Sequence, residues 1–121
     1  LIAPIGNPDR AVCFQWLSFL STALLNANNR FFFSERYGST EIVIKEKAVS
    51  DRKDCYDILE KHVDAFLSGK TCGIADFYFY VLMNWDENKA DELAIRPNLN
   101  KIFNQVSEKS SVQKVLKNQT S

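Results

Sequence analysis

The chain has 121 residues, of which 45% are apolar and 25% are charged, and its 15 basic and 15 acidic side chains cancel at neutral pH. This length fits a single domain, residues 1–121, that can bury a core without disulfides or a metal. Because the net charge is zero, the overall charge does not favour binding to nucleic acid or to an anionic membrane surface, so neither is expected as a partner. No apolar run reaches the roughly 18 residues of a membrane span.

The cysteines and the histidine point away from disulfides and metals. Cys13, Cys55 and Cys72 are odd in number and widely spaced, and with no signal peptide visible we expect reduced core thiols in a cytoplasmic protein. Paired cysteine spacing is absent and His62 is the single histidine, so no metal site is expected. His62 lies beside an apolar face and is interpreted as a packed or exposed residue rather than a catalyst. The chain begins at Leu1, which predicts that it belongs to something longer.

A first long helix is predicted over residues 8–31. Asn7 is a favourable N-cap residue, and Pro8 suits the first helical position. Apolar side chains recur at three- and four-residue steps along this stretch: Val12, Trp16, Phe19, Leu20, Ala23, Leu24, Ala27 and Phe31. The aromatic run 31–33 with Tyr37 is interpreted mainly as core or interface packing.

A second helix is predicted to start near Ser39 or Thr40. Its first part, residues 41–49, is ambiguous, because Glu-Ile-Val-Ile also has the composition of a strand. From Ser50 onward the apolar spacing is clearly helical. This helix is expected to end at the turn made by residues 68–69.

The most apolar part of the chain, residues 77–85, is interrupted by a single polar residue. Aromatic and β-branched composition would suit a strand here, but the start signal favours a helix. Asp76 follows Gly73 by three residues, which is the spacing of a capping box. The sequence therefore predicts a central helix from Ile74 to about residue 87, with Gly73 and Asp76 as its structural cap. Because it has no polar face, we expect it to be buried.

The remainder of the chain is predicted to contain one loop and two short helices. Residues 86–95 are charged and loop-like, Pro97 opens the next helix, and Ser110 or Ser111 is expected to cap a last one. The fold class is therefore all-α, a bundle of about five helices.

Two short motifs carry a resemblance to a known family. Phe66-Leu67-Ser68-Gly69 followed by Gly73-Ile74-Ala75-Asp76 resembles the "F-L-x-G … [ST]-I-A-D" signature that opens the core helix of glutathione transferase C-terminal domains. Gly73 departs from the Ser or Thr usual at that position. Taken end to end, the chain is similar to these domains, closest to the bacterial beta-class type.

The resemblance implies that two domains of the parent protein have different roles. In that family an N-terminal thioredoxin-like domain binds glutathione and carries the catalytic residue, and this domain is absent from the chain. The helical domain forms the wall of the hydrophobic-substrate site and much of a homodimer interface through its first two long helices. The resemblance thus implies no catalytic residue and no cofactor in this chain, with glutathione as co-substrate of the parent protein.

The family's substrate-binding positions correspond to Ser18, Leu25, Asn26, Asn28 and Trp85. The resemblance places Ser18 where the family has Asn, and Leu25-Asn26 where it has a His-Lys pair. It also places Asn28 at a pocket Phe and Trp85 at a retained pocket Trp. Leu25 cannot donate a hydrogen bond, and the departures at Leu25 and Asn26 favour an alternative, a non-catalytic protein-interaction module of the same fold. A helical bundle with accidental similarity is a further alternative.

Overall fold

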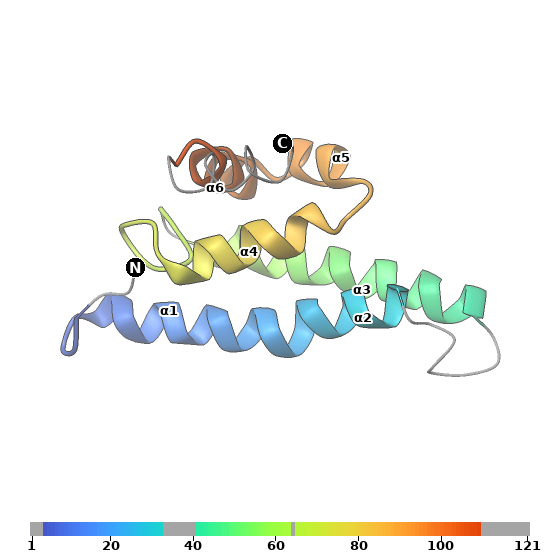
Figure 1. Ribbon diagram of the computed structural model, residues 1–121, viewed down its shortest axis with the longest axis horizontal. Coiled ribbons are helices and arrows are strands. Elements are labelled where there is room, and N and C mark those ends of the chain that lie inside the picture. The colour runs from blue at the N-terminus through green and yellow to red at the C-terminus, as the bar shows by residue number, and fades with distance from the viewer. Residues whose placement is uncertain (1–3, 33–40, 64, 110–121) are drawn as a thin grey trace, which may run out of the picture.

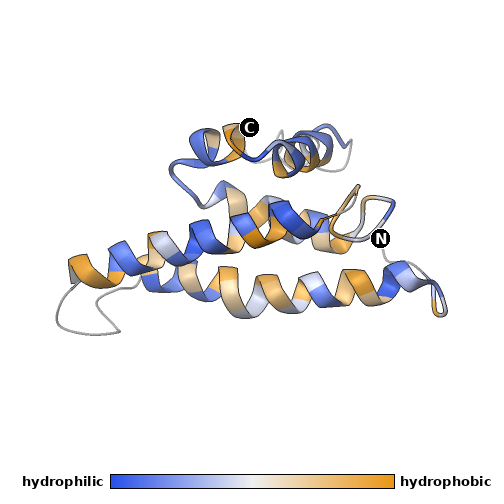
Figure 2. Ribbon diagram, turned by 180° about the vertical axis from the view of Figure 1, so that it is seen from behind, coloured by the Kyte–Doolittle hydropathy of each residue, from blue (hydrophilic) through white to orange (hydrophobic). Residues whose placement is uncertain are grey.

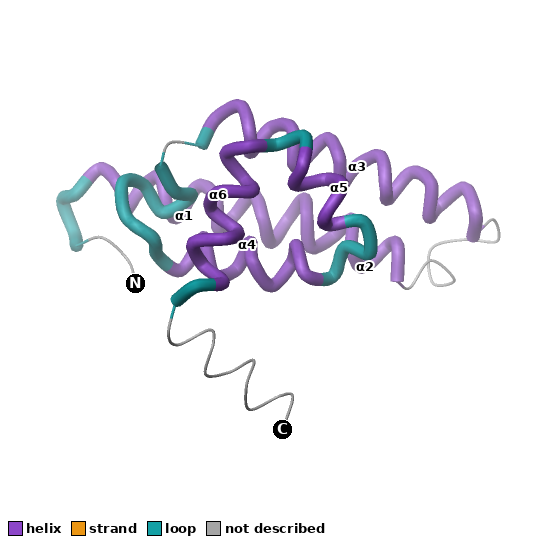
Figure 3. The backbone as a smooth tube through the Cα atoms, turned by 90° about the horizontal axis from the view of Figure 1, so that it is seen from above, coloured by secondary structure: helices purple, strands orange, loops and turns teal. Residues whose placement is uncertain are grey.

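The computed structural model describes residues 4–32, 41–63 and 65–109, whose regular elements are all helices (Figures 1 and 3). These are α1 (Pro8–Phe19), the π-helix η1 (Leu20–Leu24), α2 (Leu25–Phe32), α3 (Glu41–His62), α4 (Ile74–Asn84), α5 (Lys89–Ala94) and α6 (Pro97–Ser107). Because α1, η1 and α2 run on without a break, the described chain contains five helices. The all-α prediction is confirmed.

The first long helix extends from residue 8 to residue 32, within one residue of the prediction. The Asn7 side chain accepts a hydrogen bond from the Asp9 backbone N–H at 2.9 Å, and Pro8 takes the first helical position. The π-helix in its middle has no counterpart in the prediction. There the Ser21 and Thr22 hydroxyls donate to carbonyl oxygens one turn earlier, at 2.7–3.2 Å. Such hydroxyls compete with backbone N–H groups and open the ladder.

Helix α3 settles the ambiguity at its start, because residues 41–49 are helical and the strand interpretation is wrong. Within this part Ala48 is fully buried while Ile42 and Val43 are 71% and 57% exposed. The helix ends at His62 rather than near residue 68. The caps expected at Ser39 or Thr40 lie outside the described residues, as does Tyr37.

Residues 65–73 form a tight connection into α4 instead of a last helical turn. Phe66 and Gly69 exchange backbone hydrogen bonds of 2.9 and 3.2 Å. The buried Asp76 carboxylate accepts backbone N–H groups from Leu67, Ser68 and Gly73 at 2.7, 3.2 and 3.0 Å. Only this half of a capping box forms, because glycine has no side chain to return the bond. The carboxylate thus fixes both the connection and the start of α4.

Helix α4 begins at Ile74 as predicted and ends at Asn84, three residues early. Its inner face, which includes Phe79 and Leu82, is buried. Burial on every side does not hold within the described chain, because Val81 and Trp85 are 50% and 42% exposed. A second apolar face of α4 therefore lies open.

The segment expected to be a loop contains the short helix α5. Arg96 and Glu92 form an i,i+4 ion pair of 2.9 Å at its end, which satisfies both charges locally. Helix α6 begins at Pro97, as predicted. The last helix expected from Ser110 or Ser111 lies outside the described residues.

The helices form layers around one core (Figure 1). The long helix 8–32 lies beside α3 along η1 and α2, and α4 packs against α1 and η1. Helix α6 packs on α4 and α3, with α5 beside it. Figure 2 shows that the long helices carry both apolar and polar residues, as helices of a layered bundle require. Within the described ranges, no helix combines the length and apolar character needed to cross a bilayer.

Candidate functional site

The open face of α4 and the start of α2 form an apolar groove of about 440 Å³. We call this the α4 groove. It is lined by Leu25, Ile74, Phe77, Tyr78, Val81, Leu82 and Trp85. The α4 residues recur at three- and four-residue steps, so one helical face supplies most of the wall. Leu25 alone comes from the other side.

The chemistry of the α4 groove is that of a binding surface. Among the described residues that line it, the polar side-chain groups are the Tyr78 hydroxyl and the Trp85 indole N–H. These residues include no acid–base pair and no nucleophile with an adjacent base, so the walls that they form offer apolar contact and exclude water. Aromatic rings at such a wall favour flat apolar ligands through stacking and dispersion.

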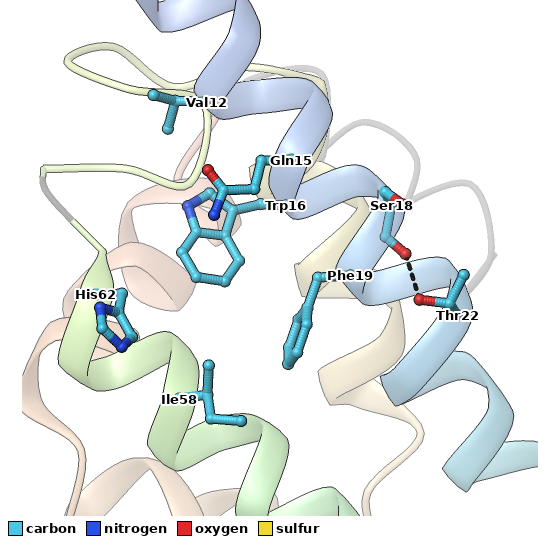
Figure 4. Close-up of a pocket in the computed structure, with 8 residues that line it drawn as sticks. All are labelled: Val12, Gln15, Trp16, Ser18, Phe19, Thr22, Ile58 and His62. Carbon is cyan, nitrogen blue, oxygen red and sulfur yellow. Dashed lines mark hydrogen bonds between the residues drawn. The ribbon is translucent and has the colours of Figure 1, made fainter.

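A second groove, of about 650 Å³, lies between α1 and α3 (Figure 4). We call this the α1–α3 groove. Its lining residues are Val12, Gln15, Trp16, Ser18, Phe19, Thr22, Ile58 and His62. The Trp16 and Phe19 rings meet edge to face with centroids 5.6 Å apart. His62, the last residue of α3, is exposed on the opposite side of this groove from Trp16.

The structure brings two of the five predicted site residues together. Leu25 and Trp85 lie in the α4 groove, whereas Ser18 lines the α1–α3 groove. Asn26 is exposed, and its Oδ1 accepts a hydrogen bond from Arg30 Nε at 2.9 Å. Asn28 is fully buried beneath α3, so it faces neither groove.

Five lining residues of the α4 groove are absent from the predicted site: Ile74, Phe77, Tyr78, Val81 and Leu82. A signal for them exists in the sequence. An amphipathic helix needs one apolar stripe to join the core, but α4 carries a second stripe at positions 74, 78, 81 and 85. An apolar stripe in excess of the core's needs indicates a surface for a ligand or another polypeptide.

Behind the α4 groove, α3 carries a buried polar cluster. The Tyr56 hydroxyl donates to Asp86 Oδ2 at 2.7 Å, and both residues are buried. Burial, helped by the bond to Asp86 and its negative charge, raises the pKa of Tyr56 far above its usual value, so it stays a hydrogen-bond donor. Arg52 lies beside this pair with 1% of its surface exposed.

The cysteines lie in different parts of the structure and are unpaired. Burial, with the Asp51 and Asp54 charges adding to it, raises the pKa of Cys55 to about 11. Burial also raises the pKa of Cys72. In the part of the chain that the structure describes, no group of three or more potential ligands from His, Cys, Asp and Glu could hold a metal ion.

Comparison with known proteins identifies the fold. Neither a family model nor a curated protein sequence matches the chain. Among solved structures it is similar to a glutathione transferase homolog from Sulfitobacter determined with bound glutathione, with a TM-score of 0.86 at 17% identity. The superposition covers 98% of this chain and 59% of the homolog. The fold is that of a glutathione transferase-like helical domain.

The chain spans about three fifths of the length of the glutathione transferase homolog. At 17% identity the likeness concerns the fold, and the beta-class assignment stays a prediction.

Proposed function

We propose that this chain is the C-terminal helical domain of a glutathione S-transferase-like protein that conjugates glutathione to electrophiles in the cytoplasm, a detoxification reaction. The α4 groove forms the hydrophobic-substrate side of the site. Parent molecules pair as homodimers through the helix 8–32 and α3. The observation that carries the proposal is the almost wholly apolar α4 groove, with Trp85 42% exposed at its end.

In this proposal the chain binds and orients the electrophile. Glutathione, held by a thioredoxin-like domain, supplies the thiol nucleophile. The rings of Phe77, Tyr78 and Trp85 hold the apolar body of the electrophile and exclude water around it. Restricting its orientation beside a thiolate removes part of the entropic barrier to a bimolecular reaction. The chain contributes binding and orientation, and the activation of the thiol belongs to the other domain.

The test measures conjugation of glutathione to 1-chloro-2,4-dinitrobenzene by the intact parent protein, with and without Trp85→Ala. Removing one aromatic wall should raise the KM for the electrophile about tenfold, which corresponds to about 1.4 kcal/mol. The KM for glutathione should stay unchanged. Ile42→Ala is the matched control, because Ile42 is 71% exposed on α3 and lines neither groove.

Absence of turnover with a panel of electrophiles, together with absence of glutathione binding by calorimetry, would contradict the proposal. Equal effects of Trp85→Ala and Ile42→Ala on the KM for the electrophile would show that the α4 groove does not bind the electrophile. The first result concerns the activity of the parent, and the second concerns the role of this chain.

One observation favours a second candidate, a non-catalytic protein-interaction module. At the two positions where the resemblance places a His-Lys pair, Leu25 is apolar and Asn26 bonds Arg30. Asn28, at the position of a pocket Phe, bonds a buried arginine. In this alternative an apolar side chain of a partner protein occupies the α4 groove. A groove that binds apolar dye while the intact parent binds no glutathione would favour this candidate over the transferase.

A further inference from the structure

Arg52 is a buried cation that touches α2, which supplies one wall of the α4 groove, and the turn that follows Trp85 on the other wall. It projects from α3 with 1% of its surface exposed. Burying a guanidinium is costly unless several partners compensate it. The positions of those partners therefore indicate what the side chain holds in place.

On one side Arg52 contacts α2, the helix that begins with Leu25. Its Nη1 donates to Asn28 Oδ1 at 3.2 Å. Its guanidinium carbon lies 4.6 Å from the centroid of the Phe31 ring, in cation–π geometry. Both partners lie within two helical turns of Leu25, so these contacts fix the part of α2 that carries the groove wall.

On the other side Arg52 contacts the turn that immediately follows Trp85. Its Nη2 lies 3.0 Å from Glu87 Oε1 and 3.8 Å from Asp86 Oδ1. Asp86 in turn accepts the Tyr56 hydroxyl at 2.7 Å and the Asn88 backbone N–H at 2.8 Å. The residue next to Trp85 is thus held to α3 by two side chains.

The cluster is not arranged for maximal stability. Arg52 Nε and Asn28 Nδ2 are buried and have no hydrogen-bond partner within the described residues. A buried donor without a partner is destabilising, and apolar replacements of buried ionic groups are often as stable. A planar guanidinium holds several partners in a fixed geometry at once, and an apolar side chain does not.

We propose that Arg52 is a positioning residue for the α4 groove: by holding α2 on one side and the turn after Trp85 on the other, it sets the distance between the Leu25 and Trp85 walls. The inference rests on the proposed function only for the identity of the ligand. The coupling between Arg52 and Trp85 is a property of this chain and can be measured without turnover.

The chain offers a matched control in Arg96. It is also buried, with 4% exposed, and pairs with two carboxylates, Asp57 at 2.7 Å and Glu92 at 2.9 Å. Its guanidinium also lies near an aromatic ring, 5.4 Å from the centroid of Tyr56. None of these contacts is made with α2 or the turn after Trp85, and Arg96 faces the ring of Tyr56 rather than the hydroxyl that bonds Asp86. Arg96→Met therefore tests the loss of a buried cation without loss of the direct groove contacts.

The experiment compares Arg52→Met, Arg52→Lys and Arg96→Met in the full chain. The readouts are acrylamide quenching and the emission maximum of tryptophan fluorescence, and the affinity for 8-anilinonaphthalene-1-sulfonate. Trp16 is 6% exposed and Trp85 is 42% exposed, so changes in quenching report chiefly on Trp85. Unfolding by urea measures stability separately.

For Arg52→Met we expect stronger quenching, a red-shifted emission maximum and a dye Kd raised about tenfold. Arg52→Lys should lie between wild type and Arg52→Met, because an ammonium keeps the charge but not the planar fork. Arg96→Met should stay within about twofold of wild type in dye Kd while losing stability. Equal fluorescence and dye responses of the Arg52 and Arg96 variants, or no response of Arg52→Met, would overturn the proposal.

Glu87→Ala serves if Arg52→Met does not fold, because it removes the carboxylate that accepts from Arg52 Nη2, and the Glu87 side chain is 46% exposed, so the core stays intact. A red shift of Trp85 in this variant supports the proposal, and an unchanged spectrum contradicts it. If the wild-type chain binds no dye, the proposed ligand groove fails, while the fluorescence of Trp85 still decides whether Arg52 positions it.

Discussion

Gly69 lies at the point where the connection before α4 meets the first turn of α1. Its φ is +114°, a conformation that side chains rarely adopt. Asp9 closes over it: its Oδ2 accepts the Lys70 backbone N–H at 3.0 Å, and a Cβ built on Gly69 would overlap Asp9 Cγ and lie 2.6 Å from Asp9 Cβ and Oδ2. Backbone conformation and close approach therefore both require glycine here.

Gly69→Ala should lower the free energy of unfolding by about 2–4 kcal/mol, from backbone strain of about 1–2 kcal/mol plus overpacking against Asp9. Gly6→Ala separates the two contributions. Gly6 has a φ of +94° but nothing within 4 Å of a built Cβ, so only the strain applies. Urea denaturation of both variants gives the values. Equal losses at the two positions would show that the approach of Asp9 has no energetic consequence.

Cys55 makes a pH-dependent contribution to stability. Its folded pKa of about 11 lies above the ordinary thiol value of 9.0, so the thiol proton is held more tightly in the folded chain. The contribution is therefore complete below pH 9 and is lost as the pH rises through about 11. Wild type should lose stability more steeply than Cys55→Ala between these values. Urea denaturation at several pH values measures the free energy of unfolding of both proteins. A parallel dependence on pH in the two proteins would contradict the raised pKa of Cys55.

At the scale of the element, the π-helix η1 depends on two exposed hydroxyls. Ser21 Oγ donates to the Leu17 carbonyl at 2.9 Å and Thr22 Oγ1 donates to the Ser18 carbonyl at 2.7 Å. The Leu17 carbonyl also accepts the Leu20 backbone N–H, and the buried Leu20 and Leu24 hold the wide turn against the core. The hydroxyls therefore stabilise a turn that packing imposes.

The double variant Ser21→Ala, Thr22→Val should lower the free energy of unfolding by about 1 kcal/mol. Exposed substitutions without such bonds usually change it by less than about 0.5 kcal/mol. Ser18→Ala is the control, since Ser18 is an exposed serine on the same helix. Thermal and urea denaturation of both variants should agree. A loss no larger than that of Ser18→Ala would mean that η1 does not need the hydroxyls.

The π-helix also explains which parts of the site could be predicted from the sequence. Ser18 and Leu25 are seven residues apart, a spacing that places two side chains on one face of a regular α-helix. The extra residue in the wide turn rotates the rest of the helix, including Leu25, by about 100°. The two residues consequently line different grooves. Periodicity cannot reveal an irregularity that depends on hydroxyl contacts and packing.

Local signals in the sequence predict the elements that carry them. The starts of α1 and α4 depend on Asn7 and Asp76, which bond backbone groups close to them in sequence. The clusters that could not be predicted join distant residues. Arg52 and Glu87 are 35 positions apart, and only the folded chain brings them together.

At the scale of the whole molecule, the proposed homodimer requires that the face formed by α1 and α3 lies in the subunit interface. Ile58 is 43% exposed on α3 and lines the α1–α3 groove. A charge in an apolar interface is desolvated without a partner and costs several kcal/mol. Ile58→Glu should therefore convert a homodimer of the intact parent protein into monomers.

Light scattering coupled to size-exclusion chromatography measures the masses. Ile95→Glu is the control, because Ile95 is 70% exposed at the end of α5 and lines neither groove. We expect Ile95→Glu to remain dimeric and Ile58→Glu to elute as a monomer that is still folded by circular dichroism. A dimer that persists in Ile58→Glu would place the interface elsewhere, and a monomeric wild-type parent would exclude the homodimer altogether. Because the α1–α3 groove shares no lining residue with the α4 groove, loss of the dimer should leave dye binding in the α4 groove unchanged.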